Sequence, residues 1–176
     1  KAFAEVKPTV ILSVPLILEK IYKKMIQPQI SKKPVSWVLK MPLLDQLVLN
    51  KIRETLMNAF GGEFSQIIIG GAPLNAEVEA FLMRIKFPIT IGYGMTETAP
   101  MISFTRPGRR KVGYAGELLP NIEAKIAENG EICVKGDNVM KGYYKREEET
   151  AQIIKDGWLH TGDMGILDKY GLKITG

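Results

Sequence analysis

The order of hydrophobic and polar residues predicts an α/β first half. Apolar residues recur at helical spacing over residues 15–30, with lysines on the opposite face, and again over residues 43–60. A short strand, TVILSV, precedes the first of these helices. The intervening residues 32–42 include two prolines and a tryptophan, so this segment is predicted to be a loop.

A strand–loop–helix–strand pattern follows in residues 66–92. The apolar run QIIIG predicts a buried strand, and Asn75 can cap a helix over residues 76–85 that is broken by Pro88. The next run, ITIG, predicts a second buried strand that ends before the polar turn YGMTET. This order is typical of a parallel βαβ unit, whose two glycine-bearing loops would lie at the carboxyl ends of the strands, where ligands bind.

From Thr105 onward the pattern becomes β-rich and rich in turns. Two alternating strands flank the Asn129-Gly130 turn and predict a hairpin, and a short polar helix is expected over residues 146–154. The runs WLHTGDMGILD and LKITG predict further short strands around the Tyr170-Gly171 turn. We therefore expect two parts: an α/β layer over residues 1–105 and a distorted, β-barrel-like subdomain over residues 106–176.

Composition narrows the class of protein. Hydrophobic residues make up 45% and charged residues 24% of the 176 residues, which excludes a collagen-like, disulfide-scaffold or wholly disordered chain. The single cysteine, Cys133, lies in the apolar run ICV and is interpreted as a buried structural thiol. No run of 18 apolar residues predicts a transmembrane helix, and the N-terminus carries no signal-peptide pattern. A cytoplasmic protein is expected.

The basic excess is confined to the first third of the chain. The net charge is +5, and residues 1–60 carry ten Lys or Arg residues against four Asp or Glu residues. The mixed charges elsewhere exclude a nucleic-acid-binding arm of the usual kind. The basic helical faces are interpreted as solvated cover for a sheet, with peripheral membrane contact as the alternative. Both ends look cut, so we expect an internal piece of a longer protein, whose oligomeric state the sequence leaves open.

The most informative segment is the turn GYGMTET, residues 92–98. Gly92 and Gly94 flank Tyr93, so the backbone can approach a ligand closely while the ring offers a flat face. The hydroxyl of Thr96 and the backbone N–H groups suit phosphate oxygens, and the carboxylate of Glu97 suits Mg²⁺. The alternative is a polar turn in which a threonine caps a short helix.

Two further segments are ambiguous on their own. Gly70–Pro73, with the sequence GGAP, could admit the edge of a planar base or simply form a tight turn before a helix. Asp163 in WLHTGD could accept hydrogen bonds from two ribose hydroxyls or stabilise a turn. The only histidine, His160, has no visible Ser, Cys or Asp partner and is interpreted as structural. One cysteine and one histidine cannot build a zinc site, and no GxxxxGK[ST] phosphate loop is present.

Four motifs taken together resemble those of the adenylate-forming superfamily. GGAPL, GYGMTE, GEICVKGDNVMKGYY and WLHTGDMG stand in that order, with about 20 residues between the first two. This superfamily includes acyl-CoA synthetases, luciferases and the adenylation domains of peptide synthetases. The segment KPTVILSVPLILEKIYKKM and the helix with KIRE resemble the long-chain fatty acyl-CoA synthetase branch.

The resemblance implies a role for each motif. The loop of Gly71, Ala72 and Pro73 matches the segment that lines the adenine, and Tyr93 matches the ring that stacks on it. The rest of the nucleotide-binding turn is matched by Gly92, Gly94 and Met95.

The catalytic roles of Thr96 and Glu97 and the ribose-binding role of Asp163 are implied in the same way. Thr96 matches the hydroxyl on the α-phosphate, Glu97 matches the carboxylate that holds Mg²⁺, and Asp163 matches the acid that holds the ribose diol. The family reaction converts a carboxylate and ATP to an acyl-adenylate and pyrophosphate, and coenzyme A then gives a thioester and AMP. No covalent enzyme nucleophile is needed, which agrees with the absence of a catalytic triad; catalysis is mainly positioning and charge neutralisation.

The departures from the family pattern are as important as the matches. The Ser/Thr/Gly-rich phosphate loop, the hinge with its arginine and the C-terminal domain with its catalytic lysine are all missing from these 176 residues. We therefore expect a fatty acid, ATP and coenzyme A to be ligands of the parent protein, and the piece itself to be inactive or nearly so. Alternatives are another acid-activating ligase of the superfamily, a non-catalytic nucleotide-binding module, and a kinase-like or P-loop ATPase. Acyl-chain length stays open.

Overall fold

The computed structural model describes residues 2–39, 41 and 44–176. Contacts divide the chain into two compact units, Lys1–Ile89 and Thr90–Gly176. The division expected between residues 105 and 106 stays a prediction.

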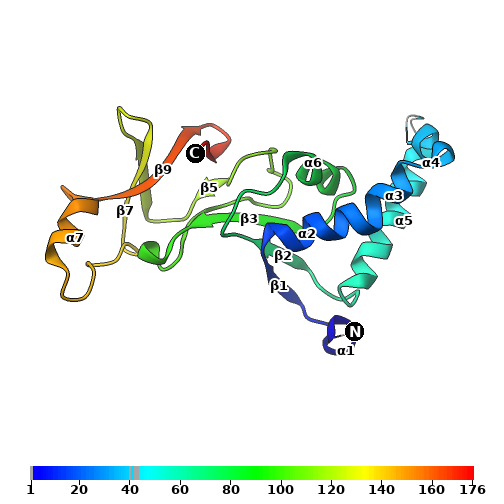
Figure 1. The fold of residues 1–176 in the computed structure, drawn as a ribbon, viewed down its shortest axis with the longest axis horizontal. Coiled ribbons are helices and arrows are strands. Elements are labelled where there is room, and N and C mark those ends of the chain that lie inside the picture. The colour runs from blue at the N-terminus through cyan, green and yellow to red at the C-terminus, as the bar shows by residue number, and fades with distance from the viewer. Residues whose placement is uncertain (1, 40, 42–43) are drawn as a thin grey trace. The chain divides into compact units, whose positions relative to one another are not determined.

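The first unit is built from helices around a parallel strand pair (Figure 1). β1 and β2 pair in parallel, from Val10 opposite Gln66 to Ser13 opposite Ile69. Its elements are α1 (Ala2–Val6), β1 (Val10–Ser13), α2 (Pro15–Ile21), the π-helical turn η1 (Tyr22–Ile26), α3 (Gln27–Ile30), α4 (Lys33–Val38), α5 (Leu44–Ala59), β2 (Gln66–Ile69) and α6 (Ala76–Arg84). The two long helical segments and both strands were expected from the sequence, whereas α1 was not.

The loop predicted over residues 32–42 is wrong for most of its length. Lys33–Val38 forms α4, with Lys32 in an extended conformation just before it and Pro34 in the first turn. A proline is tolerated there because the first N–H groups of a helix have no intrahelical acceptor. Residues 40 and 42 of the predicted loop lie outside the described residues.

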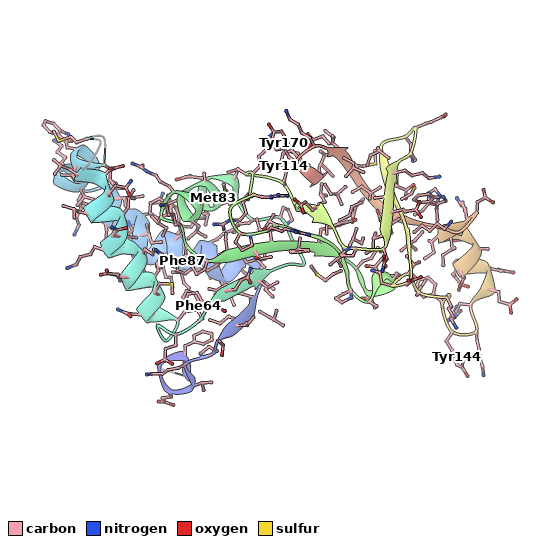
Figure 2. All side chains as sticks on the ribbon, turned by 180° about the vertical axis from the view of Figure 1, so that it is seen from behind. Phe64, Met83, Phe87, Tyr114, Tyr144 and Tyr170 are labelled. Carbon is pink, nitrogen blue, oxygen red and sulfur yellow. The ribbon has the colours of Figure 1, made fainter. Side chains whose placement is uncertain are left out.

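A cluster of aromatic rings lies among the buried aliphatic side chains of the first unit. Phe60, Phe64 and Phe87 are almost fully buried, and the rings of Phe64 and Phe87 lie 5.7 Å apart, centroid to centroid (Figure 2). Alternate residues of β2, Ile67 and Ile69, are completely buried as well. The N–H of Ile67 also donates to the carbonyl of Pro88 at 2.8 Å, so the chain that leads into the next strand lies beside β2.

The second unit is β-rich, as expected. Its elements are β3 (Ile89–Gly94), the short 3₁₀ helix η2 (Thr96–Thr98), β4 (Met101–Phe104), β5 (Glu117–Leu118), β6 (Ile122–Ile126), β7 (Glu131–Gly136), α7 (Glu147–Ile153), β8 (Ile154–Lys155), β9 (Trp158–Asp168) and β10 (Gly171–Ile174). β3 starts at the last residue of the first unit. It extends two residues beyond the predicted end of the strand, because Tyr93 pairs with Ser103 and Gly94 with Met101 of β4.

The strands of the second unit form two antiparallel groups. β3, β4 and β5 follow one another in one group, and β10, β9, β7 and β6 in the other, with β8 on the side of β9. A bridge between Gly116 and Leu172 joins the groups, so the strands curl around one core. This core consists of fully buried aliphatic side chains: Ile102, Ile132, Val134, Leu159 and Leu172. The mixed α/β fold with a distorted β-subdomain is therefore confirmed.

No helix within residues 2–39, 41 and 44–176 combines the length and the apolar character that crossing a membrane would require.

Candidate nucleotide-binding site

Asp163 lies on a distortion of β9. Cys133 of β7 is paired with His160, yet Glu131, only two residues earlier on β7, is paired with Met164. β9 therefore contains extra residues between these pairs, and Gly162 adopts the left-handed conformation with φ of +78°. Irregularities of this kind redirect a side chain and are common beside binding sites. Here the redirected residue is Asp163, the predicted ribose ligand.

The structure brings Asp163 and Tyr93 together. The hydroxyl of Tyr93 donates to Oδ2 of Asp163 at 2.7 Å, and the N–H of Asp163 donates to Oγ1 of Thr161 at 3.1 Å. Burial raises the pKa of the Tyr93 phenol, the Thr161 hydroxyl lowers it, and the Asp163 carboxylate raises it again. The balance is a raised pKa, which keeps the phenol protonated as a donor. Two residues predicted to contact adjacent parts of one nucleoside are thus direct neighbours.

Two glycines allow the strand that carries Tyr93 to approach β4 closely. A Cβ atom at Gly94 would overlap the carbonyl of Pro100, and one at Gly92 would press on the side chain of Met101. Met95 is half-buried and packs against the aliphatic core. The glycines and Met95 therefore shape the turn, and contact with a nucleotide remains a prediction for all three.

The two threonines of the turn play different parts. Thr98 is completely buried, and its hydroxyl accepts from the N–H of Met95 at 3.2 Å and contacts the carbonyl oxygens of Met95 and Pro100. The capping role that the sequence left open thus belongs to Thr98. Thr96 is exposed, so its hydroxyl is accessible to a ligand such as a phosphate group.

Glu97 is held from a distant part of the sequence. The hydroxyl of Tyr143 donates to Oε1 of Glu97 at 2.6 Å, and the N–H of Met140 donates to the Glu97 carbonyl at 2.8 Å. The hydrogen bond from Tyr143 to Glu97 raises the pKa of the tyrosine. Nearby, the side-chain amide of Asn138 donates to the carbonyls of Thr98 and Met101 at 2.6 and 2.7 Å. Residues 138–143 therefore clamp the turn and orient one oxygen of its carboxylate.

The glycine loop belongs to the first unit. Gly71, Ala72 and Pro73 are exposed, and Gly71 is left-handed with φ of +84°. The loop ends at Asn75, whose side chain caps α6 by accepting from the N–H groups of Glu77 and Val78 at 3.0 and 3.3 Å. The N-cap was predicted correctly. The role of this loop beside adenine stays a prediction.

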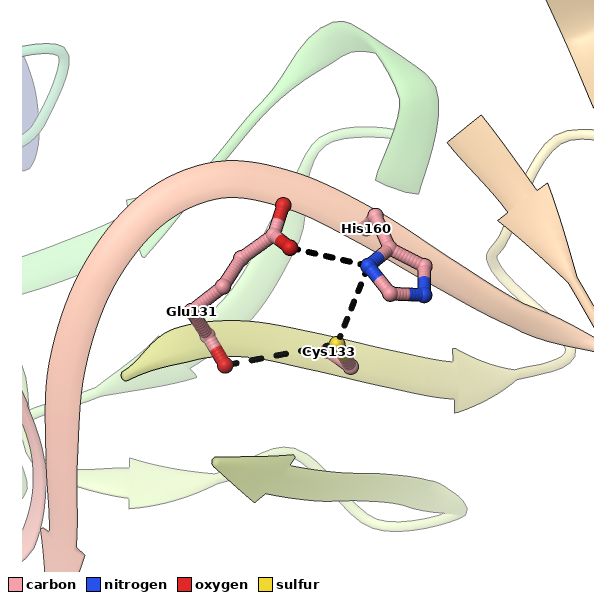
Figure 3. Close-up of side chains that lie close together, drawn as sticks. All are labelled: Glu131, Cys133 and His160. Atoms are coloured by element: carbon pink, nitrogen blue, oxygen red, sulfur yellow. Dashed lines mark hydrogen bonds and ion pairs between the residues drawn. The ribbon is translucent and has the colours of Figure 1, made fainter. Parts of the chain in front are cut away.

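His160 has partners that the sequence did not reveal. Nδ1 of His160 lies 2.8 Å from Oε2 of Glu131 and 3.5 Å from Sγ of Cys133 (Figure 3). The ligand-type atoms of these three residues lie within 4.8 Å of one another, so the argument that one cysteine and one histidine cannot form a metal cluster was incomplete. Cys133 is completely buried, as expected.

Sequence reasoning missed the residues that hold the motif side chains in place: Glu131, Asn138 and Tyr143. One signal was present. All three lie in the segment GEICVKGDNVMKGYY, which the resemblance had already singled out without assigning it a role. The pairing of β7 with β9 explains the role of Glu131, since it brings the start of this segment to the bulge that carries Asp163.

The chain combines an α/β unit with a curled β-rich unit, and its GYGMTET turn carries the carboxylate of Glu97. This combination is typical of the N-terminal domain of adenylate-forming enzymes. The family model described as AMP-binding enzyme matches residues 1–144. The chain belongs to this family.

Curated relatives point to one branch of the family. The chain is 33% identical over 195 residues to the long-chain-fatty-acid–CoA ligase FadD15 of Mycobacterium bovis, covering 97% of this chain and 32% of the relative. It is 32% identical to long chain acyl-CoA synthetase 4 of Arabidopsis thaliana, covering 92% of this chain and 29% of the relative. The predicted resemblance to the long-chain branch is thereby confirmed. The chain spans about a third of the length of these relatives.

Solved structures agree with the fold. One is the o-succinylbenzoate coenzyme A synthetase of Bacillus subtilis in complex with ATP and a magnesium ion, which is 28% identical with a TM-score of 0.67. The match covers 98% of this chain and 32% of that one. The amide bond synthetase McbA of Marinactinospora thermotolerans shares the fold at 22% identity, with a TM-score of 0.72 and coverage of 99% and 33%.

Proposed function

We propose that this chain forms part of the adenylate pocket of a long-chain fatty acid–CoA ligase. The full-length ligase activates a fatty acid with ATP and Mg²⁺ to an acyl-adenylate, and coenzyme A then displaces AMP to give the thioester. The observation that carries the proposal is the hydrogen bond between Tyr93 and Asp163, which joins two separate nucleotide motifs. The names of the curated relatives support the choice of a fatty acid as the substrate.

The residues divide the work by their chemistry. The ring of Tyr93 offers a flat face for adenine, and Asp163 accepts hydrogen bonds from the ribose hydroxyls with its second oxygen, since Tyr93 occupies the first. The exposed hydroxyl of Thr96 donates to the α-phosphate. Glu97 would hold Mg²⁺, which neutralises phosphate charge as the fatty acid carboxylate attacks. Gly71, Ala72 and Pro73 would line the adenine with backbone groups.

The chemistry needs no base or covalent nucleophile from this chain. Two anions, the fatty acid and ATP, are brought together, so orientation and charge neutralisation supply most of the rate enhancement. Glu97 can serve this purpose only with a cation between its carboxylate and the phosphates, because a bare carboxylate would repel them.

Pyrophosphate exchange tests the proposal. The full-length ligase should exchange pyrophosphate into ATP only when a long-chain fatty acid is present, and it should release AMP and not ADP. Release of ADP would contradict the proposal in favour of a kinase-like or P-loop ATPase. Nucleotide binding without exchange would instead favour a non-catalytic module.

Two comparisons sharpen this test. Exchange that depends on a short-chain or aromatic acid, and not on a long-chain one, would move the protein to another acid-activating branch. The 176-residue chain alone spans about a third of its relatives, so we expect it to bind adenylate weakly and to show no exchange.

A further inference from the structure

The bulge that carries Asp163 needs a partner for its backbone. Between His160 and Met164, β9 leaves its regular pairing with β7, so an N–H group in this stretch loses its ladder acceptor. The side chain of Glu131 supplies that acceptor: its Oε1 accepts from the N–H of Gly162 at 2.9 Å.

The other oxygen of the same carboxylate holds β9 at the residue where the bulge begins. Oε2 of Glu131 lies 2.8 Å from Nδ1 of His160 (Figure 3). An ionised carboxylate only accepts hydrogen bonds, so Nδ1 is the donor. The Glu131 side chain therefore ties together His160 and Gly162, both within the three residues before Asp163, and it is only 16% exposed.

Thr161 completes the support. Its hydroxyl donates to the carbonyl of Ile132 at 2.8 Å and accepts from the N–H of Asp163 at 3.1 Å. All three residues between Leu159 and Asp163 are thus bonded to β7, two of them to the Glu131 carboxylate.

We propose that Glu131 is a positioning residue for ribose recognition: its carboxylate holds the Gly162 bulge so that Asp163 presents its free oxygen to the ribose hydroxyls. This inference rests on the proposed function, because it takes Asp163 to be the ribose ligand. Glu131 itself touches no substrate; it acts through Asp163.

The bonding pattern favours this role over a metal site at Glu131, Cys133 and His160. Both carboxylate oxygens and Nδ1 already satisfy one another or the backbone. Burial raises the pKa of the Cys133 thiol, and the negative charge of Glu131 raises it further. A thiol that keeps its proton is a poor metal ligand, since metals bind the thiolate.

The test compares two nucleotides in the full-length ligase. AMP and 2′,3′-dideoxy-AMP differ only in the ribose hydroxyls, so the ratio of their dissociation constants isolates recognition by Asp163. Calorimetry should give a ratio of about tenfold or more for the wild-type protein, as expected for hydrogen bonds to a charged group. Glu131→Ala should bring the ratio close to one, and Glu131→Gln should reduce it by at least about threefold, because the neutral amide keeps only one acceptor.

The matched control is Glu128→Gln. Glu128 is exposed and lies in the same hairpin, so its substitution should leave the ratio unchanged. If Glu131 had a purely structural role, its substitution would lower the melting temperature and weaken the binding of both nucleotides equally. An unchanged ratio in folded Glu131→Gln would overturn the inference, and this variant decides if Glu131→Ala fails to fold.

Two further outcomes are distinguishable. If the wild-type ratio is near one, or if Asp163→Ala keeps the wild-type ratio, the ribose role of Asp163 fails, and the inference that depends on it fails as well. The wild-type ratio should also survive EDTA, because the proposed brace around Glu131 consists of hydrogen bonds alone. A ratio that collapses with EDTA and returns with Zn²⁺ would overturn the hydrogen-bonded brace in favour of a metal site.

Discussion

The two glycine-bearing segments that the sequence predicts to contact a nucleotide are held in different ways. In the first unit, the loop of Gly71, Ala72 and Pro73 is exposed and is held at its flanks: the N–H of Gly70 donates to the carbonyl of Ser13 at 3.4 Å, and the N–H of Asn75 donates to Oε1 of Glu19 at 2.9 Å. In the second unit, the turn that contains Glu97 is held by hydrogen bonds of its own Thr98 and by hydrogen bonds from residues 138–143.

The difference follows from what each segment would present to a ligand. A loop that offers backbone groups to the edge of a base needs correct φ and ψ angles, and small residues provide them at little cost. A turn that must hold a carboxylate near phosphates has to fix a side chain, which requires hydrogen bonds from elsewhere in the chain. Substitutions of the residues that hold the turn should therefore weaken ATP binding even though these residues do not touch ATP. Substitutions of the residues that flank the loop should have little effect on ATP binding.

The largest effect is expected for Glu97→Gln in the full-length protein. This change keeps the shape but removes the charge that would hold Mg²⁺, so the adenylation rate should fall by at least about tenfold. Thioester formation from supplied acyl-adenylate should fall much less, because no pyrophosphate leaves in that step. Single-turnover kinetics of each half-reaction measure both.

Tyr143→Phe is the control for the charge of Glu97. Tyr143→Phe removes the hydrogen bond to Glu97 but leaves the charge, so it should cost only a few-fold in the adenylation rate. Equal losses in both half-reactions of Glu97→Gln, or an unchanged dependence on Mg²⁺, would argue against a metal ligand and for a simple turn residue.

Tyr93 should show a graded response. Tyr93→Ala removes both the ring and the hydrogen bond to Asp163, and we expect the apparent ATP constant to rise by about tenfold or more, since stacking on a base contributes about 1–3 kcal/mol. Tyr93→Phe keeps the ring and should cost less. If Phe is as damaging as Ala in steady-state kinetics, the hydroxyl carries the role and the stacking assignment is wrong.

A pair of asparagines compares the two segments in stability. Asn138→Ala leaves the carbonyls of Thr98 and Met101 without this donor and should lower the free energy of unfolding by about 1–3 kcal/mol, with weaker ATP binding. Asn75→Ala removes the cap of α6 and should lower it by about 1 kcal/mol, with ATP binding nearly unchanged. Denaturant titrations and ATP binding measure the two effects. If ATP binding weakened in Asn75→Ala and not in Asn138→Ala, the expected difference between the loop and the turn would be contradicted.

The smallest effect concerns acid stability. The hydrogen bond from His160 lowers the pKa of Glu131 below its usual 4.5, and burial opposes this shift only partly. A depressed folded-state pKa stabilises the protein above the unfolded value, and this stabilisation is lost as the pH falls through the folded value. The difference in free energy of unfolding between wild type and Glu131→Gln should therefore be present above the usual value of 4.5 and narrow as the pH falls from there through the lower folded-state pKa. A constant difference would argue against an ionised Glu131.

Local sequence patterns predicted most elements because their causes are local. The Asn75 cap, the Asn129-Gly130 turn and the buried run of β2 each depend on neighbouring residues. Where the prediction failed, a local rule was read too strictly. Pro34 stands in the first turn of α4, where a proline does not break a helix.

The supporting residues of the site could not be predicted in this way. Tyr143 lies 46 positions from Glu97, and His160 lies 29 positions from Glu131. Their contacts depend on the bulged register between β7 and β9 and on the path of residues 138–143, neither of which a periodic pattern encodes. The motifs thus indicate which side chains face a ligand, and the fold shows what holds them there.

A crystal structure of the full-length protein with AMP tests the central claim most directly. The ring of Tyr93 should lie flat against the adenine, and the Asp163 carboxylate should lie within hydrogen-bonding distance of the ribose hydroxyls while it keeps its bond to Tyr93. AMP bound away from Tyr93 and Asp163, or a ribose contacted by other residues only, would contradict the account.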